Sequence, residues 1–419
     1  MKKIICHAWL LVLLGIFCIT SCSRQNHEPL ILWTDNAEFA SYTELFNASQ
    51  KDVKVVAVYK TNLADSLPPK KGEKKPDIIA GSWLASGIKR HQFASLNSVF
   101  TNGITREMFY RELLEFGKKG KTQYLIPVNF NLGAIVFDIN NSDYVENTST
   151  LTFDQLKEYS GKYNSKAKDG TYLRMGFAPQ WNPDFLYETL VTQGINFTIE
   201  NNNIKYNLPE LERVCNFLKD WTLDMNTSYN SEKDFAFKYL YTPYNKQVLQ
   251  QKSLFAYTTS DKLLALSDDQ LTNIDFRWFV YTDKSPVQED ITMMGIYKKS
   301  KNKSGAKQFI QWFMKSESQE QMIKRRVQMN LDTNTFGIAG GFSSIPYVNE
   351  FILPLYYKNL LAKVPSASIT MAPYSYPSNW NQIKNEVIIP YLLAQVNNSK
   401  NTDSLADYYT DWLSQNKED

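Results

Sequence analysis

The sequence predicts an α/β protein built from two domains. Short runs of β-branched and apolar residues alternate with segments whose apolar residues recur at helical spacing, which is the pattern of α/β architecture. A chain of 419 residues is too long for one compact core, and it shows no repeat of fixed period. We therefore expect two cores of ordinary size.

The N-terminal part predicts strands with one helix between the first two. The strand-like runs are residues 30–33, 53–59 and 77–81. Apolar positions within residues 42–49 fall on one side of a helix. Two further runs, 124–128 and 132–137, predict strands that are joined through Asn129-Phe130-Asn131.

The middle of the chain carries clear helix signals. Thr152 with Gln155 three residues later forms a capping box. Pro183 near the start and Gly194 past the end bracket a second helix. A third, following Pro209, places Cys215 on an apolar face, so we expect Cys215 to be a buried core residue rather than a reactive thiol.

The last part predicts strands at residues 254–257, 276–281 and 292–296. Helices are predicted around 306–313, from Ser316 towards Met329, and over 405–413. Because these segments also alternate, they extend the α/β pattern to the C-terminal end.

The first 22 residues predict export and lipid attachment. Lys2 and Lys3 precede an apolar run from Ile4 to Ile19, which is shorter than the roughly 20 residues that a membrane-spanning helix needs. The approach to Cys22 resembles the box at which bacterial lipoproteins are cleaved and acylated. We expect residues 1–21 to be a signal peptide, Cys22 to carry lipid and residues 22–28 to be a tether. An ordinary secretory signal with an incidental cysteine is the alternative.

Charge excludes one class of partner. The formal net charge is +3 and no strong basic field is present, so no nucleic-acid partner is expected. No second apolar stretch is long enough to span a bilayer.

Several segments resemble, in the same order, the extracellular solute-binding proteins of the maltose-binding type (family 1). They are residues 32–35, 76–80, 124–128, 134–138, 151–156, 294–296, 301–313 and 378–380. The resemblance implies a periplasmic-binding-protein type II fold, with two discontinuous α/β lobes, a hinge and a ligand cleft between the lobes. It implies a lobe of residues 29–129 plus 288–336 and a second lobe of 130–287 plus 337–419.

The same resemblance implies the function. Such a protein captures a small molecule, here a sugar or oligosaccharide, and delivers it to the permease subunits of an ABC importer. We expect a monomer held at the periplasmic or extracytoplasmic face of a membrane through lipid on Cys22, with no cofactor, no metal and no catalysis. The expected hinge segments are residues 128–132, 283–290 and 336–341.

Aromatic residues beside polar ones in predicted loops are the candidates for sugar binding. Aromatic rings stack on the C–H faces of a sugar, while amide and carboxylate groups take its hydroxyls. Trp83, Trp181 and Trp380 are the expected stacking platforms. The full candidate set is Trp33, Thr34, Asp35, Asn36, Glu38, Ser82, Trp83, Asn129, Phe130, Trp181, Asn182, Tyr257 and Trp380. Burial of any of these aromatic rings in the core is the alternative for a chain this rich in aromatic residues.

Other functions stay open. A glycosidase using two carboxylates is one, although none of the common hydrolase or nucleotide-binding motifs occurs. The same fold could hold glycerol phosphate, a polyamine, a peptide or a metal, with Tyr356-Tyr357 and Tyr408-Tyr409 as candidate ferric-iron ligands. A surface lipoprotein for adhesion or sensing is the third alternative.

Overall fold

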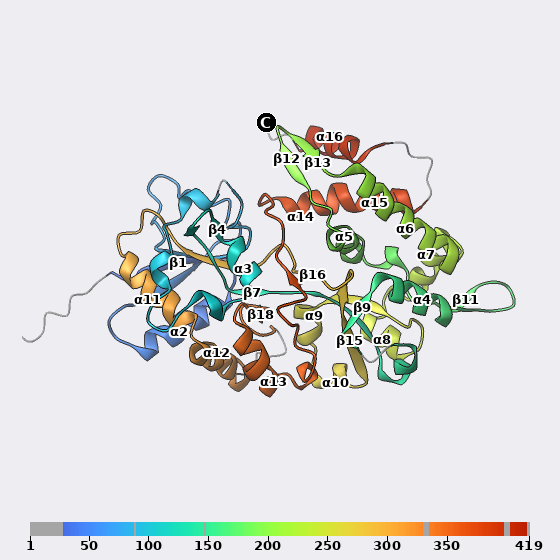
Figure 1. Cartoon of the computed structure of the whole chain (residues 1–419), viewed down its shortest axis with the longest axis horizontal. Helices are drawn as coiled ribbons and strands as arrows, with labels where there is room; N and C mark the ends of the chain where they lie inside the picture. The colour runs from blue at the N-terminus through green and yellow to red at the C-terminus, as the bar shows by residue number, and fades with distance from the viewer. Residues whose placement is uncertain (1–27, 88, 146–147, 330–334, 398–402, 417–419) are drawn as a thin grey trace, which may run out of the picture.

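A computed structural model describes residues 28–87, 89–145, 148–329, 335–397 and 403–416 (Figure 1). The predicted signal peptide, Cys22 and all but the last residue of the predicted tether lie outside these residues. Within the described part of the chain, no helix is long and apolar enough to cross a membrane.

One lobe is built on a five-stranded sheet with the order β2-β1-β3-β17-β6. Its strands are β1 (Leu30–Thr34), β2 (Val55–Tyr59), β3 (Ile78–Gly81), β17 (Met293–Ile296) and β6 (Ile126–Pro127). β1 pairs in parallel with both β2 and β3, whereas β17 runs antiparallel to β3. Every residue of β1 and β3 is buried, as is typical of parallel strands in an α/β sheet.

Three helices carry the core of this first lobe: α2 (Glu38–Ser49), α11 (Lys303–Phe313) and α12 (Ser316–Gln328). The rings of Phe39 and Phe313 stack with centroids 5.5 Å apart, which joins α2 to a helix distant in sequence. Figure 1 shows α2, α11 and β1 together at one end of the molecule.

The other lobe is built on a four-stranded sheet with the order β14-β8-β15-β9. Its strands are β14 (Ala256–Thr259), β8 (Gly133–Asp138), β15 (Ile274–Val280) and β9 (Thr150–Thr152). The main helices are α4 (Phe153–Tyr163), α5 (Pro183–Thr192), α6 (Leu208–Asn226), α15 (Ile389–Val396) and α16 (Leu405–Gln415). The predicted capping box of α4 is confirmed, because Thr152 N–H donates to Gln155 Oε1 at 3.0 Å and Gln155 N–H to Thr152 Oγ1 at 3.3 Å.

Short elements complete the two lobes. The helices among them are α3 (Arg111–Phe116), α7 (Tyr229–Lys238), α8 (Tyr244–Leu249), α9 (Ser260–Leu264), α10 (Asp268–Leu271), α13 (Leu353–Tyr356) and α14 (Trp380–Ile383), with the π-helical turns η6 (Val348–Ile352) and η8 (Lys384–Ile388). The two-stranded ribbons are β4 (Lys118–Lys119) with β5 (Thr122–Gln123), β10 (Ser165–Lys166) with β11 (Tyr172–Arg174), and β12 (Thr198–Glu200) with β13 (Asn203–Lys205).

Two chain segments cross between the lobes where the sequence predicts hinges. Because β6 and β8 belong to different sheets, residues 128–132 connect the lobes, and residues 281–292 return between β15 and β17. Small pairs reinforce this region: β7 (Asn129–Phe130) with β18 (Phe342–Ser343), and β16 (Ser285–Pro286) with β19 (Thr370–Met371). Figure 1 shows β7, β16 and β18 between the two ends of the molecule.

The chain between β18 and α14 contacts both lobes. In the first lobe, η6 packs against α12 and β19 lies against α3. In the second lobe, Lys363 forms an ion pair with Asp275 of β15, and Tyr376 and Trp380 belong to the core around α15 and α16. The third hinge segment, residues 336–341, therefore stays a prediction.

The strand predicted over residues 124–128 forms only in part. Pro127 has no backbone N–H with which to form a strand hydrogen bond. Thr292 N–H donates to Asn129 Oδ1 at 3.0 Å rather than to a backbone carbonyl of a neighbouring strand. Within residues 124–128, only the two-residue strand β6 forms.

The expectation for Cys215 is confirmed. Its thiol is free and lies in the core formed by α6, α15 and α16. Burial raises the pKa of this thiol to about 12, so the thiolate that reacts with oxidants is not formed near neutral pH.

Candidate functional site

A cleft opens where the three parallel strands of the first lobe end. The loops that follow β1, β2 and β3 begin at Asp35, Lys60 and Ser82, so their side chains gather at one edge of the sheet. The carboxyl ends of parallel strands are where open α/β sheets bind ligands. Facing them from the second lobe are the loop before α14, α14 itself and η8.

Two cavities form this interlobe cleft. The first, of about 340 Å³, lies between the lobes and is lined by Asp35, Thr61, Asn62, Leu63, Ala64, Asp65, Ser82, Trp83, Asp290, Ser378 and Asn381. The second, of about 280 Å³, extends along the second lobe and is lined by Asn131, Asp184, Thr259, Asp261, Lys262, Gln288, Glu289, Asp290, Asn381, Lys384 and Asn385. Because Asp290 and Asn381 border both, we treat the two as one continuous site.

Trp83 provides the aromatic wall of the interlobe cleft. Its ring is half-buried, and its backbone has φ of 61°, a left-handed conformation that a bulky residue rarely adopts. It also lines a narrow pocket with Glu289, Tyr374 and Tyr376, beside the larger cavity. A sparsely populated backbone conformation is common at ligand sites.

Asp35 fixes the loop that carries Trp83. Its carboxylate accepts a hydrogen bond from Ser82 N–H at 3.0 Å. Burial raises the pKa of Asp35, and the Ser82 N–H opposes this shift because it stabilises the charged form. The two strand-end loops are therefore held together at the floor of the cleft.

Acidic residues surround the single buried lysine of the cleft. Lys384 Nζ lies 3.7 Å from Asp184 Oδ1 and 3.9 Å from Glu289 Oε2. Behind them, burial and the charge of Glu289 raise the pKa of Glu188 to about 8. The carboxylates outnumber the cations that could balance them.

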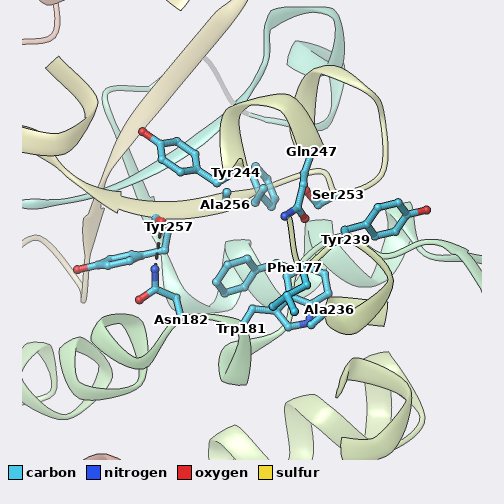
Figure 2. Close-up of a pocket in the computed structure, with 12 residues that line it drawn as sticks. Phe177, Trp181, Asn182, Ala236, Tyr239, Tyr244, Gln247, Ser253, Ala256 and Tyr257 are labelled. Carbon is cyan, nitrogen blue, oxygen red and sulfur yellow. Dashed lines mark hydrogen bonds between the residues drawn. The ribbon is translucent and has the colours of Figure 1, made fainter. Parts of the chain in front are cut away.

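A third cavity, of about 200 Å³, lies inside the second lobe, and half of its lining residues are aromatic. Figure 2 shows Trp181, Phe177, Tyr239 and Tyr244 around it, with Asn182 and Tyr257 at one end. Trp181 stacks on Phe235 with centroids 5.4 Å apart and donates from Nε1 to the Glu232 carbonyl at 3.0 Å. This ring is therefore held by the lobe itself.

The structure brings some predicted residues to cavities. Asp35, Ser82 and Trp83 line the interlobe cleft, whereas Trp181, Asn182 and Tyr257 line the cavity inside the second lobe. Asn182 is also the N-cap of α5, since its side-chain oxygen accepts from Asp184 N–H at 2.9 Å.

Other predicted residues hold the fold in this conformation. Trp33 and Phe130 are 1% exposed, Thr34 is 2% exposed, and Trp380 is fully buried with its ring stacked on Tyr376 at 3.9 Å. A ligand cannot reach these side chains as they stand, because the core formed around both sheets encloses them.

The side chains of the remaining three polar candidates bond to other residues of the protein. Asn36 and Asn129 both donate to the Ala339 carbonyl, at 2.9 and 2.7 Å. Glu38 forms an ion pair with Arg326 and accepts from Tyr42. Asn36 and Asn129 therefore hold the loop around residue 339 to the loop after β1 and to β7, while Glu38 links α2 to α12.

The tyrosine pairs considered for iron do not meet. Tyr357 packs on Phe336 in one core, while Tyr409 stacks with Trp412 in the other. Within the described ranges, no group of three or more His, Cys, Asp or Glu side chains is placed to hold a metal ion.

Sequence reasoning missed much of the cleft. Thr61–Asp65, Asp261, Lys262, Gln288–Asp290, Ser378, Asn381 and Lys384 were not among its candidates. Thr61 to Asp65 had a usable signal, because they follow a predicted strand next to another strand whose end was already chosen. No signal in the sequence indicated Lys384, since it lies within a helical turn.

Residues 33–320 match the family model described as bacterial extracellular solute-binding protein. The chain belongs to this family. The predicted family and its α/β fold of the type II periplasmic-binding class are thereby confirmed. No curated protein matches the chain.

Solved structures share the fold of this solute-binding protein at low sequence identity. The cyclic alpha-maltosyl-1,6-maltose binding protein from Arthrobacter globiformis is 17% identical, with a TM-score of 0.61 over 91% of this chain and 96% of its own. The sugar-binding protein MalE from Xanthomonas citri is 9% identical, with a TM-score of 0.66 over 92% and 96%. CpMnBP1 with mannotriose bound is 14% identical, with a TM-score of 0.59 over 93% and 100%.

Proposed function

We propose that this solute-binding protein captures a carbohydrate-like molecule in the interlobe cleft and delivers it to the permease of an ABC importer, while lipid on Cys22 holds it at the extracytoplasmic face of a membrane. The observation that carries the proposal is the cleft itself, which combines the partly buried Trp83 with polar side chains from both lobes. The similar structures of a cyclic alpha-maltosyl-1,6-maltose binding protein and of CpMnBP1 with mannotriose bound support it.

The chemistry of the cleft suits a sugar. Trp83 and Tyr374 offer ring faces for the C–H side of a pyranose, while Asn62, Asn381 and the carboxylates offer donors and acceptors for its hydroxyls. Capture requires no covalent step, so these groups act by binding and by excluding water.

Closure would couple capture to delivery. Asp35, Asp65 and Trp83 belong to the first lobe, whereas Ser378 and Asn381 belong to the second, so a guest contacts both sets only when the lobes are close. A ligand that binds the closed form better than the open form shifts the population towards it. The crossing segments 128–132 and 281–292 would act as the hinge.

Titration calorimetry and thermal unfolding with neutral and amino saccharides test the capture step. We expect saturable binding of one ligand per chain and a rise in melting temperature with ligand concentration. Absence of any response to the whole set would reject the carbohydrate assignment. Turnover of a glycoside by the pure protein would instead favour an enzyme.

Lipid attachment has its own experiment. Cells expressing the full chain are fed a radiolabelled fatty acid, and membrane and soluble fractions are compared with those of Cys22→Ala. We expect label and membrane retention only with Cys22 present. An unlabelled protein that is secreted in both cases would support the ordinary signal peptide.

A further inference from the structure

The interlobe cleft carries an excess of negative charge. Its two cavities are lined by the carboxylates of Asp35, Asp65, Asp184, Asp261, Glu289 and Asp290. The only cationic side chains among the lining residues are Lys262 and Lys384. A cleft lined by one sign of charge concentrates ligands of the other sign and disfavours anions.

Glu289 has an oxygen without a partner among the described residues. The side chain is 7% exposed, and only its Oε2 approaches Lys384, at 3.9 Å. Its Oε1 is buried with no hydrogen-bond partner. A buried carboxylate oxygen left unpaired is costly, and a ligand that donates to it recovers the loss.

The position of Glu289 links charge to the aromatic wall. It lines both the polar cavity with Asp184 and Lys384 and the narrow pocket with Trp83 and Tyr376. A group next to it is therefore close to ring faces as well as to carboxylates. An ammonium group gains from both, through a charge-assisted hydrogen bond and through attraction to an aromatic face.

From this arrangement we infer that the saccharide captured in the cleft carries a protonated amine, which Glu289 receives beside Trp83. The inference rests on the proposed function and names the class of its ligand as amino sugars. Metal binding is not the reason for the acidic lining, because no described group of acidic side chains has the geometry to hold an ion.

Three disaccharides that differ only at carbon 2 test the inference. They are the β-1,4-linked glucosamine dimer, its diacetylated form and cellobiose, which carry an ammonium, an acetamide and a hydroxyl group. In calorimetry at pH 6.5, where the amine is protonated, we expect the glucosamine dimer to bind at least about tenfold more tightly than the other two. Added salt should weaken that preference, since screening acts on the charged ligand alone.

Single substitutions identify the carboxylate that receives the ammonium group of the ligand. Glu289→Gln should reduce the preference to about threefold or less, and the ratio of the two affinities isolates the ammonium contribution from any change in binding of the neutral saccharide. Asp261→Asn, at a less buried cleft position, should reduce it more weakly. Asp234→Asn removes a carboxylate on α7 far from the cleft and serves as the matched control.

The outcomes separate the inference from the function on which it rests. If a neutral saccharide binds and the glucosamine dimer binds no better, the inference is wrong and carbohydrate capture stands. If no saccharide binds but spermidine does, the cleft selects cations and the carbohydrate function is wrong. If the preference persists in Glu289→Gln, the amine is received elsewhere and the role given to Glu289 is wrong.

Discussion

Ser378 Oγ donates a hydrogen bond to Asp65 Oδ1 at 2.5 Å, and this contact joins the loop before α14 to the loop after β2. A second contact, from Ser375 Oγ to the Ala85 carbonyl at 3.0 Å, lies beside it. Both link one lobe directly to the other at the mouth of the interlobe cleft. They are therefore among the contacts that opening would break.

Ser378→Ala should favour the open form. The Asp65 side chain is 57% exposed, so the lost hydrogen bond is worth only about 0.5–1 kcal/mol. We expect the dissociation constant to rise about two- to fivefold. Calorimetry measures the affinity, and X-ray scattering should show a slightly larger ligand-free protein. Ser414→Ala, on the exposed tail helix, is the control; equal effects of both changes would contradict the role of this contact.

Trp83→Ala should abolish most saccharide binding. Loss of a stacking ring is expected to cost about 1–3 kcal/mol in binding, or roughly 5- to 150-fold in affinity. Because the ring also packs against both cores, the melting temperature should fall as well, so affinity is measured at a temperature where the variant is folded. Trp181→Phe changes an indole in the other cavity and should leave affinity unchanged. The reverse pattern would move the binding site to the cavity inside the second lobe.

Glu38 and Arg326 should prove structural. Arg326 is buried and donates to Glu38 and to the Gly337 carbonyl, so Arg326→Met leaves an uncompensated carboxylate. We expect a loss of about 3 kcal/mol in the free energy of unfolding, measured by urea denaturation.

The double variant Arg326→Met with Glu38→Gln should recover part of that loss, since no charge remains unpaired. Ligand affinity should be unchanged in this double variant. A selective loss of affinity with full stability would return Glu38 to the ligand-binding set.

Glu188 should make the protein less stable as pH rises. Its pKa is about 8 in the folded protein against 4.5 for the free side chain, so the folded state holds a proton that the unfolded state has lost. Stability therefore falls between pH 4.5 and 8, by up to about 1.4 kcal/mol per pH unit, and is level above that range. Glu188→Gln should flatten this slope in melting curves taken from pH 5 to 8. A slope identical to that of the unchanged protein would mean that Glu188 titrates normally.

Local signals in the sequence were sufficient to predict these helices and strands. Capping by Thr152, the apolar face around Cys215 and the strand runs before Asp35 and Ser82 involve neighbours within a few residues, and the structure confirms each. The family could also be recognised, because the order of its segments is a property of the chain alone.

The sequence did not indicate which aromatic candidates line the cleft and which lie in the core. Trp83 and Trp380 both follow predicted loops with polar neighbours, yet one lines the cleft and the other stacks on Tyr376 inside the core. Nothing within either segment distinguishes them. Burial depends on which distant elements pack over a ring, and a local pattern contains no information about that.

The sequence by itself determined the α/β elements and the loops at the ends of the first strands, since hydrophobic periodicity and turn residues act locally. The two lobes were implied by the resemblance to the family. Only the tertiary structure decided which residues share one cleft, among them Asp65, Glu289, Lys384 and Ser378. It also decided that Glu38 forms an ion pair with Arg326 instead of lining that cleft. These partners lie far apart along the chain. Their meeting follows from the packing of two discontinuous lobes, and the electrostatic character of the site follows from that meeting.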